Sequence, residues 1–197
     1  MRPFDELENW QEKHGFTLSD DELPIYFTPT AAEKIVSLVL AHSLEIGWDM
    51  TVKPYKNGYK IYDVFVYPQK VAGASIDVDL HGDYKDWKNE LEEEVEQNLF
   101  GQGHSHVNME PFASIVDINH QYEQILFKRK GFYLFQIWNK QMHVSSYFYD
   151  VSNRVYYDPD HVVLLIDFED DDENSGDMTQ FIDNSFTMLK GYDYESE

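Results

Sequence analysis

The sequence contains no cysteine among its 197 residues. Disulfide bridges are therefore excluded, and so are zinc sites built from thiolate ligands. The sequence also lacks any run of about 18 apolar residues, so no transmembrane helix is expected. Its N-terminal segment, MRPFDELENWQEKHG, has no apolar core of the kind that a signal peptide needs. These absences make the cytoplasm the default compartment and predict no association with a membrane.

Basic residues are scarce, because 15 Lys and Arg stand against 37 Asp and Glu, for a formal net charge of −22. A nucleic-acid-binding protein needs a basic surface to neutralise phosphates, so the composition argues against that class. An acidic surface favours solubility and attracts basic peptides. The composition therefore predicts no nucleic-acid partner.

Aromatic residues are abundant at 16%, and the hydrophobic content of 42% suits one compact domain. The sequence predicts a hairpin over 47–69 with an Asn57-Gly58 turn, and further strands at LFGQGHSH, KGFYLFQIW, QMHVSSYFYD and HVVLLIDF. Helices are predicted over 83–99, after Ser114 and around 178–190. Interleaved helices and strands indicate an α/β or α+β protein built on one mixed sheet.

A helix is also predicted from about residue 30 to 44, with Ile35 and Val39 on its buried side. Its start has two possible forms. Thr28 can cap it with Pro29 at the first helical position, or Thr30 can cap it with Glu33 closing a capping box.

The expected organisation has three parts. Residues 1–24 are polar and mixed, and are expected to form an N-terminal extension. Residues 25–168 carry all the strong strand and helix patterns and are expected to be the functional domain. Residues 169–197 begin with EDDDENSGD and are expected to form an acidic linker and a C-terminal helix.

The stretch GQGHSHVNMEPFASIVD, residues 101–117, concentrates side chains that bind metals. On an extended strand, His104 and His106 face the same side, because side chains alternate with period two. Ser114 and Asp117 are three residues apart and share one face of a helix. If that helix starts just after the strand, Asp117 can turn back toward the histidines. Two neutral imidazoles and one carboxylate leave a fourth tetrahedral position open, which is typical of a catalytic zinc site.

A zinc hydrolase also needs a group that takes and hands on protons. Glu45 stands at the expected junction between the first helix and the strand WDMTV, where a carboxylate can project into a cleft beside the metal. With 37 acidic residues in the chain, others compete for this role. Ser114 is placed to donate a hydrogen bond to a developing oxyanion, which is worth roughly 3 kcal/mol in hydrolases.

The pattern His104-x-His106, seven residues and then Ser114-x-x-Asp117 resembles the JAMM (MPN-type) metalloprotease signature, which a glutamate precedes as Glu45 does here. The resemblance implies a mixed β-sheet flanked by helices, the MPN fold related to cytidine deaminases. It implies a zinc-dependent metallopeptidase or isopeptidase with His104, His106 and Asp117 as zinc ligands. Glu45 and Ser114 would be the catalytic residues, and ubiquitin-like proteins would be among the substrates.

Two other functions are alternatives to a zinc peptidase. A non-catalytic scaffold or protein-binding module on the same fold would tolerate the loss of Glu45. A zinc deaminase uses H-x-E and P-C-x-x-C patterns, and the sequence has neither.

Gly103 and Val107 depart from the JAMM family, which often has an aromatic residue and a proline there; these departures concern substrate fit more than metal binding. Five of the six other histidines are predicted to be ordinary surface or core residues, because they have no partner at metal-ligand spacing: His42, His81, His120, His143 and His161.

Overall fold

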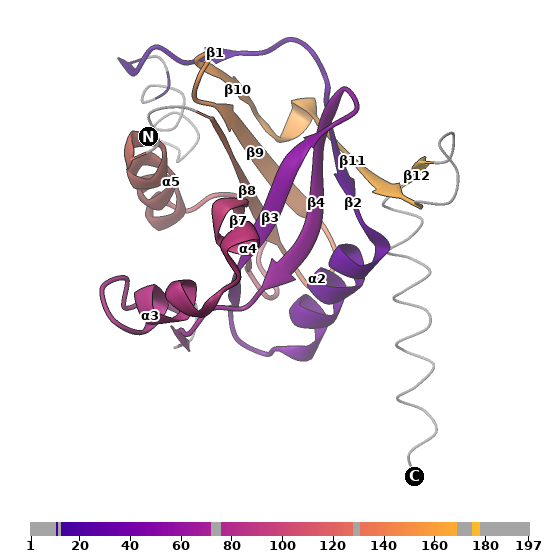
Figure 1. The fold of residues 1–197 in the computed structure, drawn as a ribbon. Coiled ribbons are helices and arrows are strands. Elements are labelled where there is room, and N and C mark those ends of the chain that lie inside the picture. The colour runs from indigo at the N-terminus through magenta and orange to yellow at the C-terminus, as the bar shows by residue number, and fades with distance from the viewer. Residues whose placement is uncertain (1–10, 12, 72–75, 128–130, 169–174, 178–197) are drawn as a thin grey trace.

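The computed structural model describes residues 11, 13–71, 76–127, 131–168 and 175–177. Ten strands of these residues form one mixed sheet (Figure 1). In spatial order they are β1 (Thr17–Leu18), β10 (Val155–Tyr157), β9 (Val144–Asp150), β8 (Phe132–Trp138), β7 (Leu99–Ser105), β3 (Gly47–Tyr55), β4 (Gly58–Phe65), β2 (Leu23–Phe27), β11 (Val162–Asp167) and β12 (Ser175–Asp177). A second, small sheet pairs β5 (Lys70–Val71) with β6 (Ile76–Asp77).

The predicted hairpin is present as β3 and β4, but its turn lies one residue earlier than expected. Tyr55 pairs with Gly58, so the two turn residues are Lys56 and Asn57, and Lys56 adopts the positive φ of 50°. Gly58 is required for a different reason. A Cβ at this position would lie 2.0 Å from the carbonyl oxygen of Pro24, so only glycine lets β4 approach the parallel strand β2.

The large sheet curls on itself into a half-barrel. The rings of Tyr59 on β4 and Phe148 on β9 have centroids 4.4 Å apart, although three strands lie between β4 and β9 in the sheet. In a flat sheet these four strand spacings would separate the two strands by about 19 Å. The concave face therefore closes on its own side chains, and much of the main core lies inside this curve.

Two helices cover the faces of the sheet. α2 (Pro29–Ala41) begins at Pro29, and Oγ1 of Thr28 accepts a hydrogen bond from the N–H of Ala31 at 3.1 Å, which confirms the first of the two predicted starts. α2 contributes Ile35 and Val39 to the main core cluster. α5 (Ile115–Phe127) contributes Ile118 to a second cluster with aromatic residues of β8 and β9. No helix in the described ranges is long and apolar enough to cross a membrane.

The predicted helix-flanked α/β fold, the cytidine-deaminase-like MPN fold, is wrong. The described residues form a mostly-β protein around the curled sheet, with few helices. The helix predicted over 83–99 is replaced by two short helices, α3 (Asp83–Glu90) and α4 (Glu93–Gln97), and neither buries a residue. A continuous helix here would place glutamates four residues apart, as at Glu90 and Glu94, where like charges repel. This segment therefore supplies no helical layer against the sheet.

The described parts of the two terminal segments also join the sheet. Phe16 is buried, β1 pairs with β10, and β2 begins at Leu23, all within the segment expected to be an extension. At the other end, β12 lies in the expected acidic linker and pairs with β11. The helix predicted at 178–190 lies outside the described residues.

Candidate metal centre

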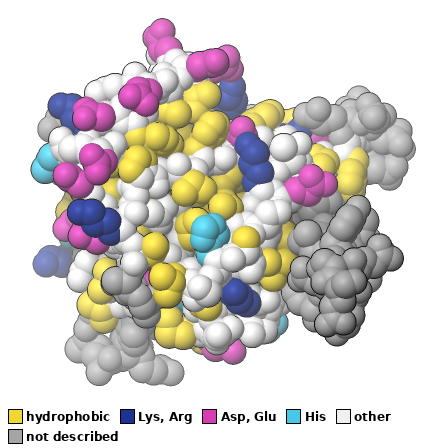
Figure 2. All heavy atoms as spheres, turned by 90° about the horizontal axis from the view of Figure 1, so that it is seen from below, with side chains coloured by type: hydrophobic (Ala, Val, Ile, Leu, Met, Phe, Trp, Pro, Cys, Tyr) yellow, Lys and Arg dark blue, Asp and Glu magenta, His cyan; other side chains and the backbone are white. Residues whose placement is uncertain are grey.

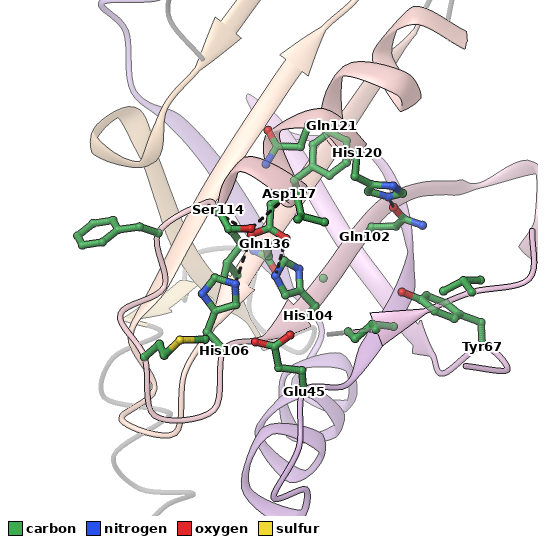
Figure 3. Close-up of a pocket in the computed structure, with 18 of the residues that line it drawn as sticks. Glu45, Tyr67, Gln102, His104, His106, Ser114, Asp117, His120, Gln121 and Gln136 are labelled. Atoms are coloured by element: carbon green, nitrogen blue, oxygen red, sulfur yellow. Dashed lines mark hydrogen bonds and ion pairs between the residues drawn. The ribbon is translucent and has the colours of Figure 1, made fainter. Parts of the chain in front are cut away.

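β7 carries the histidines of the predicted metal site to one end of the sheet. Ser105 points into the protein and is buried, whereas His104 and His106 lie on the other side with ring centroids 4.9 Å apart (Figure 3). His106 comes directly after the strand, and its backbone N–H donates to the carbonyl oxygen of Trp138 at 2.7 Å. The structure thus places both imidazoles on one side, as period-two alternation predicted.

The pairing of β3 with β7 brings Glu45 to the histidines. The N–H of Ile46 donates to Oγ of Ser105 at 3.2 Å, across 59 residues of sequence, and the N–H of Ser105 donates to the carbonyl oxygen of Ile46 at 3.0 Å. Glu45 precedes this contact in the link between α2 and β3. Its side chain is 6% exposed, and its carboxylate points toward the two imidazoles (Figure 3).

Asp117 is held by the start of α5. Ser114 directly precedes the helix, and its backbone N–H donates to Oδ2 of Asp117 at 2.7 Å. In return, the N–H of Asp117 donates to Oγ of Ser114 at 3.2 Å. This reciprocal arrangement is a capping box with aspartate in place of glutamate. It turns the carboxylate back along the helix, toward β7.

The three predicted ligands meet. Nε2 of His104 lies 3.1 Å from Oδ1 of Asp117, and Nε2 of His106 lies 3.4 Å from Oδ2. Ligand atoms from all three residues lie within 4.8 Å of one another, so the group could hold a metal ion. A tetrahedral zinc ion with ligands at about 2.0–2.1 Å keeps them about 3.3–3.4 Å apart. The two distances between an imidazole nitrogen and a carboxylate oxygen are therefore already near the spacing that zinc requires.

The orientation of His106 makes its outward nitrogen available to a cation. Its Nδ1 lies 3.2 Å from the carbonyl oxygen of Glu110. A carbonyl only accepts hydrogen bonds, so Nδ1 carries the proton, and Nε2 of the neutral ring has a lone pair. This lone pair faces a carboxylate oxygen of Asp117, and two acceptors at this distance need a proton or a metal ion between them. Metal-binding histidines commonly use a carbonyl in this way.

The Asn139 side chain anchors the loop next to Glu110. The buried amide of Asn139 donates from Nδ2 to the carbonyl oxygen of Met109 at 3.1 Å, while its Oδ1 accepts from the N–H groups of Gln141 and His143. Between this loop and β7, Val107 adopts a φ of 49°. Positive φ is strained for a β-branched residue, so the turn that follows the second histidine is held by its surroundings.

Burial and charge set the protonation of the site. Burial opposes ionisation of Asp117, but hydrogen bonds from both histidines hold its pKa well below the usual range. Burial would lower the pKa of His106, whereas its bonds to Asp117 and the Glu110 carbonyl raise it. Burial raises the pKa of Glu45, and the nearby histidines only partly offset this. Glu45 is thus closer than an exposed glutamate to the range in which a general base works best.

The sequence interpretation missed a polar chain beside the histidines. Nε2 of His120 lies 2.6 Å from Oε1 of Gln102, and Gln102 also contacts Tyr84, whose hydroxyl donates to Oδ2 of Asp49 at 2.6 Å. His120 has a hydrogen-bond partner, as predicted for a satisfied histidine, and it lines the same pocket as the three ligands. Two spacings in the sequence could have predicted this. His120 follows Asp117 by three residues on one helix, and Gln102 precedes His104 by two residues on one strand.

All five predicted site residues line one pocket of about 500 Å³. Its lining includes residues of β7, β8, the link before β3, the loop 109–112, the start of α5 and the segment 76–84, which are separate in sequence. Comparison of the chain with protein-family models found no matching family, and comparison with curated proteins found no match. The function must therefore be argued from the geometry of this pocket.

Proposed function

We propose that the protein is a zinc-dependent hydrolase of amide bonds, a metallopeptidase or isopeptidase that acts on a protein or peptide. The observation that carries the proposal is the meeting of the Asp117 carboxylate with Nε2 of His104 and of His106. Two imidazoles and one carboxylate leave a position open for chemistry, as in catalytic zinc sites. The resemblance of the same residues to the JAMM signature supports this proposal independently of the fold.

Glu45 supplies the proton transfers. It is buried in the pocket, its carboxylate points toward the imidazoles (Figure 3), and its pKa is raised by burial. In the proposed reaction it accepts a proton from the attacking water and later delivers that proton to the leaving amine. A non-catalytic scaffold gives no reason to bury a carboxylate beside a metal centre at this cost in desolvation.

Ser114 stabilises the charge that develops on the amide oxygen. Its Oγ accepts a hydrogen bond from the N–H of Asp117. Its hydroxyl also contacts the Asp117 carboxylate, and in the proposed reaction it turns its proton from that carboxylate to the amide oxygen. One such donor contributes a factor of roughly 10²–10³ to turnover in hydrolases. When bound, a zinc ion would polarise the amide carbonyl and lower the pKa of water to about 7.

The test combines metal analysis with a matched pair of glutamate variants. The zinc-supplied protein should contain one zinc per chain. It should also cleave members of a panel of peptides and ubiquitin-like conjugates, and a chelator should stop the cleavage. Glu45→Gln should keep zinc and lose turnover by about 10²–10⁴-fold. Glu90→Gln should retain both, because Glu90 is exposed and does not line the pocket.

Three results would contradict the proposal. The first is a wild-type protein that holds no zinc when zinc is supplied. The second is a preference for iron, because two histidines and one carboxylate also form the iron site of non-haem oxygenases. The third is a Glu45→Gln variant that cleaves as fast as the wild type.

A further inference from the structure

Large apolar side chains surround the mouth of the metal pocket. Val116 is 76% exposed, Phe112 63% and Met109 49%, and all three line the pocket together with the ligands. On the face seen from below, hydrophobic side chains gather over the middle and many charged side chains lie toward the edges (Figure 2). Exposed apolar side chains that adjoin one another at a pocket indicate a binding surface.

These three side chains are attached to the metal centre by the chain itself. Met109 and Phe112 lie between two of the ligands, and Val116 directly precedes Asp117. The segment is anchored: the N–H of Met109 donates to the carbonyl oxygen of His106 at 2.9 Å, and Ala113 next to Phe112 is buried. A molecule that presents an amide to the metal must therefore lie against this apolar wall.

The charge of the pocket narrows the chemistry of that molecule. Its lining includes the carboxyl groups of Glu45, Glu110 and Asp117, and no Lys or Arg lines it among the described residues. The chain as a whole has a net charge of −22. A bound Zn²⁺ ion would offset two of these three negative charges, so the lining stays acidic with the metal in place. An acidic side chain against the wall would therefore meet like charge in a partly desolvated cleft, where repulsion is stronger than in water.

We propose that the pocket selects substrates that carry a bulky apolar side chain next to the amide that is cleaved, and rejects an acidic side chain at that place. The apolar side chain lies against Met109, Phe112 and Val116. This inference rests on the proposed zinc hydrolase function, because it assumes that the amide lies at the metal centre.

Three small hydroxamates test this selectivity without measuring turnover, since the hydroxamate group binds zinc and the rest of the molecule probes the wall. Acetohydroxamate has no side chain, 3-phenylpropanohydroxamate adds a phenyl group, and succinic monohydroxamate adds a carboxylate. Isothermal titration of the zinc-loaded protein should show the phenyl compound binding at least about 10-fold more tightly than acetohydroxamate, because it removes apolar area from water. The carboxylate compound should bind more weakly than acetohydroxamate.

Surface variants assign the preference to this wall. The double variant Phe112→Ser with Val116→Ser should bind 3-phenylpropanohydroxamate and acetohydroxamate with similar affinity. Leu126→Ser is the matched control, because Leu126 lies on the same helix as Val116, is 59% exposed and does not line the pocket. It should keep the wild-type preference.

Zinc content, measured for every variant, separates the two levels of the inference. A zinc-loaded wild type that binds the three hydroxamates equally, or binds none of them, overturns the apolar selectivity and leaves the metal centre standing. A preference that persists in the double variant also overturns it. A wild type that takes up no zinc overturns the proposed function itself.

Discussion

Ser114 and Asp117 exchange two hydrogen bonds, N–H to Oδ2 at 2.7 Å and N–H to Oγ at 3.2 Å. The pair therefore begins α5 and belongs to the metal centre at the same time. Because an amide oxygen can replace Oδ2 in the cap but is a poor substitute for a charged ligand, the two roles can be separated by substitution.

The first prediction separates these two roles. Asp117→Asn should keep a folded α5 and weaken zinc binding by more than about 100-fold, since the loss of a mere hydrogen-bond partner of a ligand already costs about 10–100-fold. Ser114→Ala should lower the free energy of unfolding by about 1 kcal/mol through loss of the cap and keep zinc. Calorimetric zinc titration and thermal unfolding of both variants check this; unchanged zinc affinity in Asp117→Asn would exclude Asp117 as a ligand.

The second prediction concerns the glycine before His104. A Cβ on Gly103 would lie 2.3 Å from Nε1 of Trp48, a side chain with 0% exposure and no room to move. Gly103→Ala should therefore destabilise the fold by about 1–3 kcal/mol and displace His104. At Gly101, on the same strand, a Cβ would lie 3.0 Å from its nearest neighbour, a methyl carbon of Val52. Gly101→Ala should therefore lower the free energy of unfolding by less. Denaturant unfolding and zinc titration of the two variants give the comparison, and equal losses would refute the packing argument.

The third prediction concerns Asn139, which bonds the carbonyl of Met109, the residue before the one whose carbonyl contacts His106. Asn139→Asp keeps the acceptor oxygen but loses the donor to the carbonyl oxygen of Met109. Zinc affinity should fall by about 10–100-fold, as for other partners of metal ligands. Gln141→Ala is the control, since only its backbone N–H contacts Asn139 and its side chain is exposed. If Asn139→Asp binds zinc as tightly as the wild type, the loop is held by other contacts.

The parts of the site that the sequence predicted correctly depend on local geometry. Alternation along a strand placed His104 with His106, and helical spacing placed Ser114 with Asp117. The position of Glu45 followed from a helix–strand junction, although its place near the histidines depends on the contact of Ile46 with Ser105, across 59 residues. Such a contact could be expected only from the resemblance to a known signature.

The sheet itself could not be predicted in the same way. β2 lies between β4 and β11, and Leu23 pairs with Val162 far along the sequence. No local pattern encodes this parallel pairing or the curl that brings Tyr59 onto Phe148. The two-residue strand β1 is too short for any period to show. The chemistry of the site was therefore easier to anticipate than the fold that supports it.

The fourth prediction concerns a buried ion pair outside the metal pocket. Nζ of Lys60 lies 2.5 Å from Oδ2 of Asp167, and both side chains are 3% exposed. Lys60→Met would leave the Asp167 carboxylate buried with Tyr55 and, at 3.5 Å, Lys56 as its partners, and should cost roughly 3 kcal/mol. Lys34→Met breaks a pair with Asp63 of similar length whose side chains are 45% and 36% exposed. It should cost less than about 1 kcal/mol.

Acid should weaken the same pair. Burial would raise the pKa of Asp167, but hydrogen bonds from Lys60 and Tyr55 and the charge of Lys60 hold it below its ordinary value of 3.8. A carboxylate with a lowered pKa in the folded state stabilises the protein above its unfolded-state pKa, and this stability is lost as the pH falls toward the folded-state pKa. Unfolding measured from about pH 5 down to about pH 2 should therefore show a steeper loss in the wild type than in Lys60→Met. Parallel curves would mean that Asp167 does not depend on Lys60 for its charge.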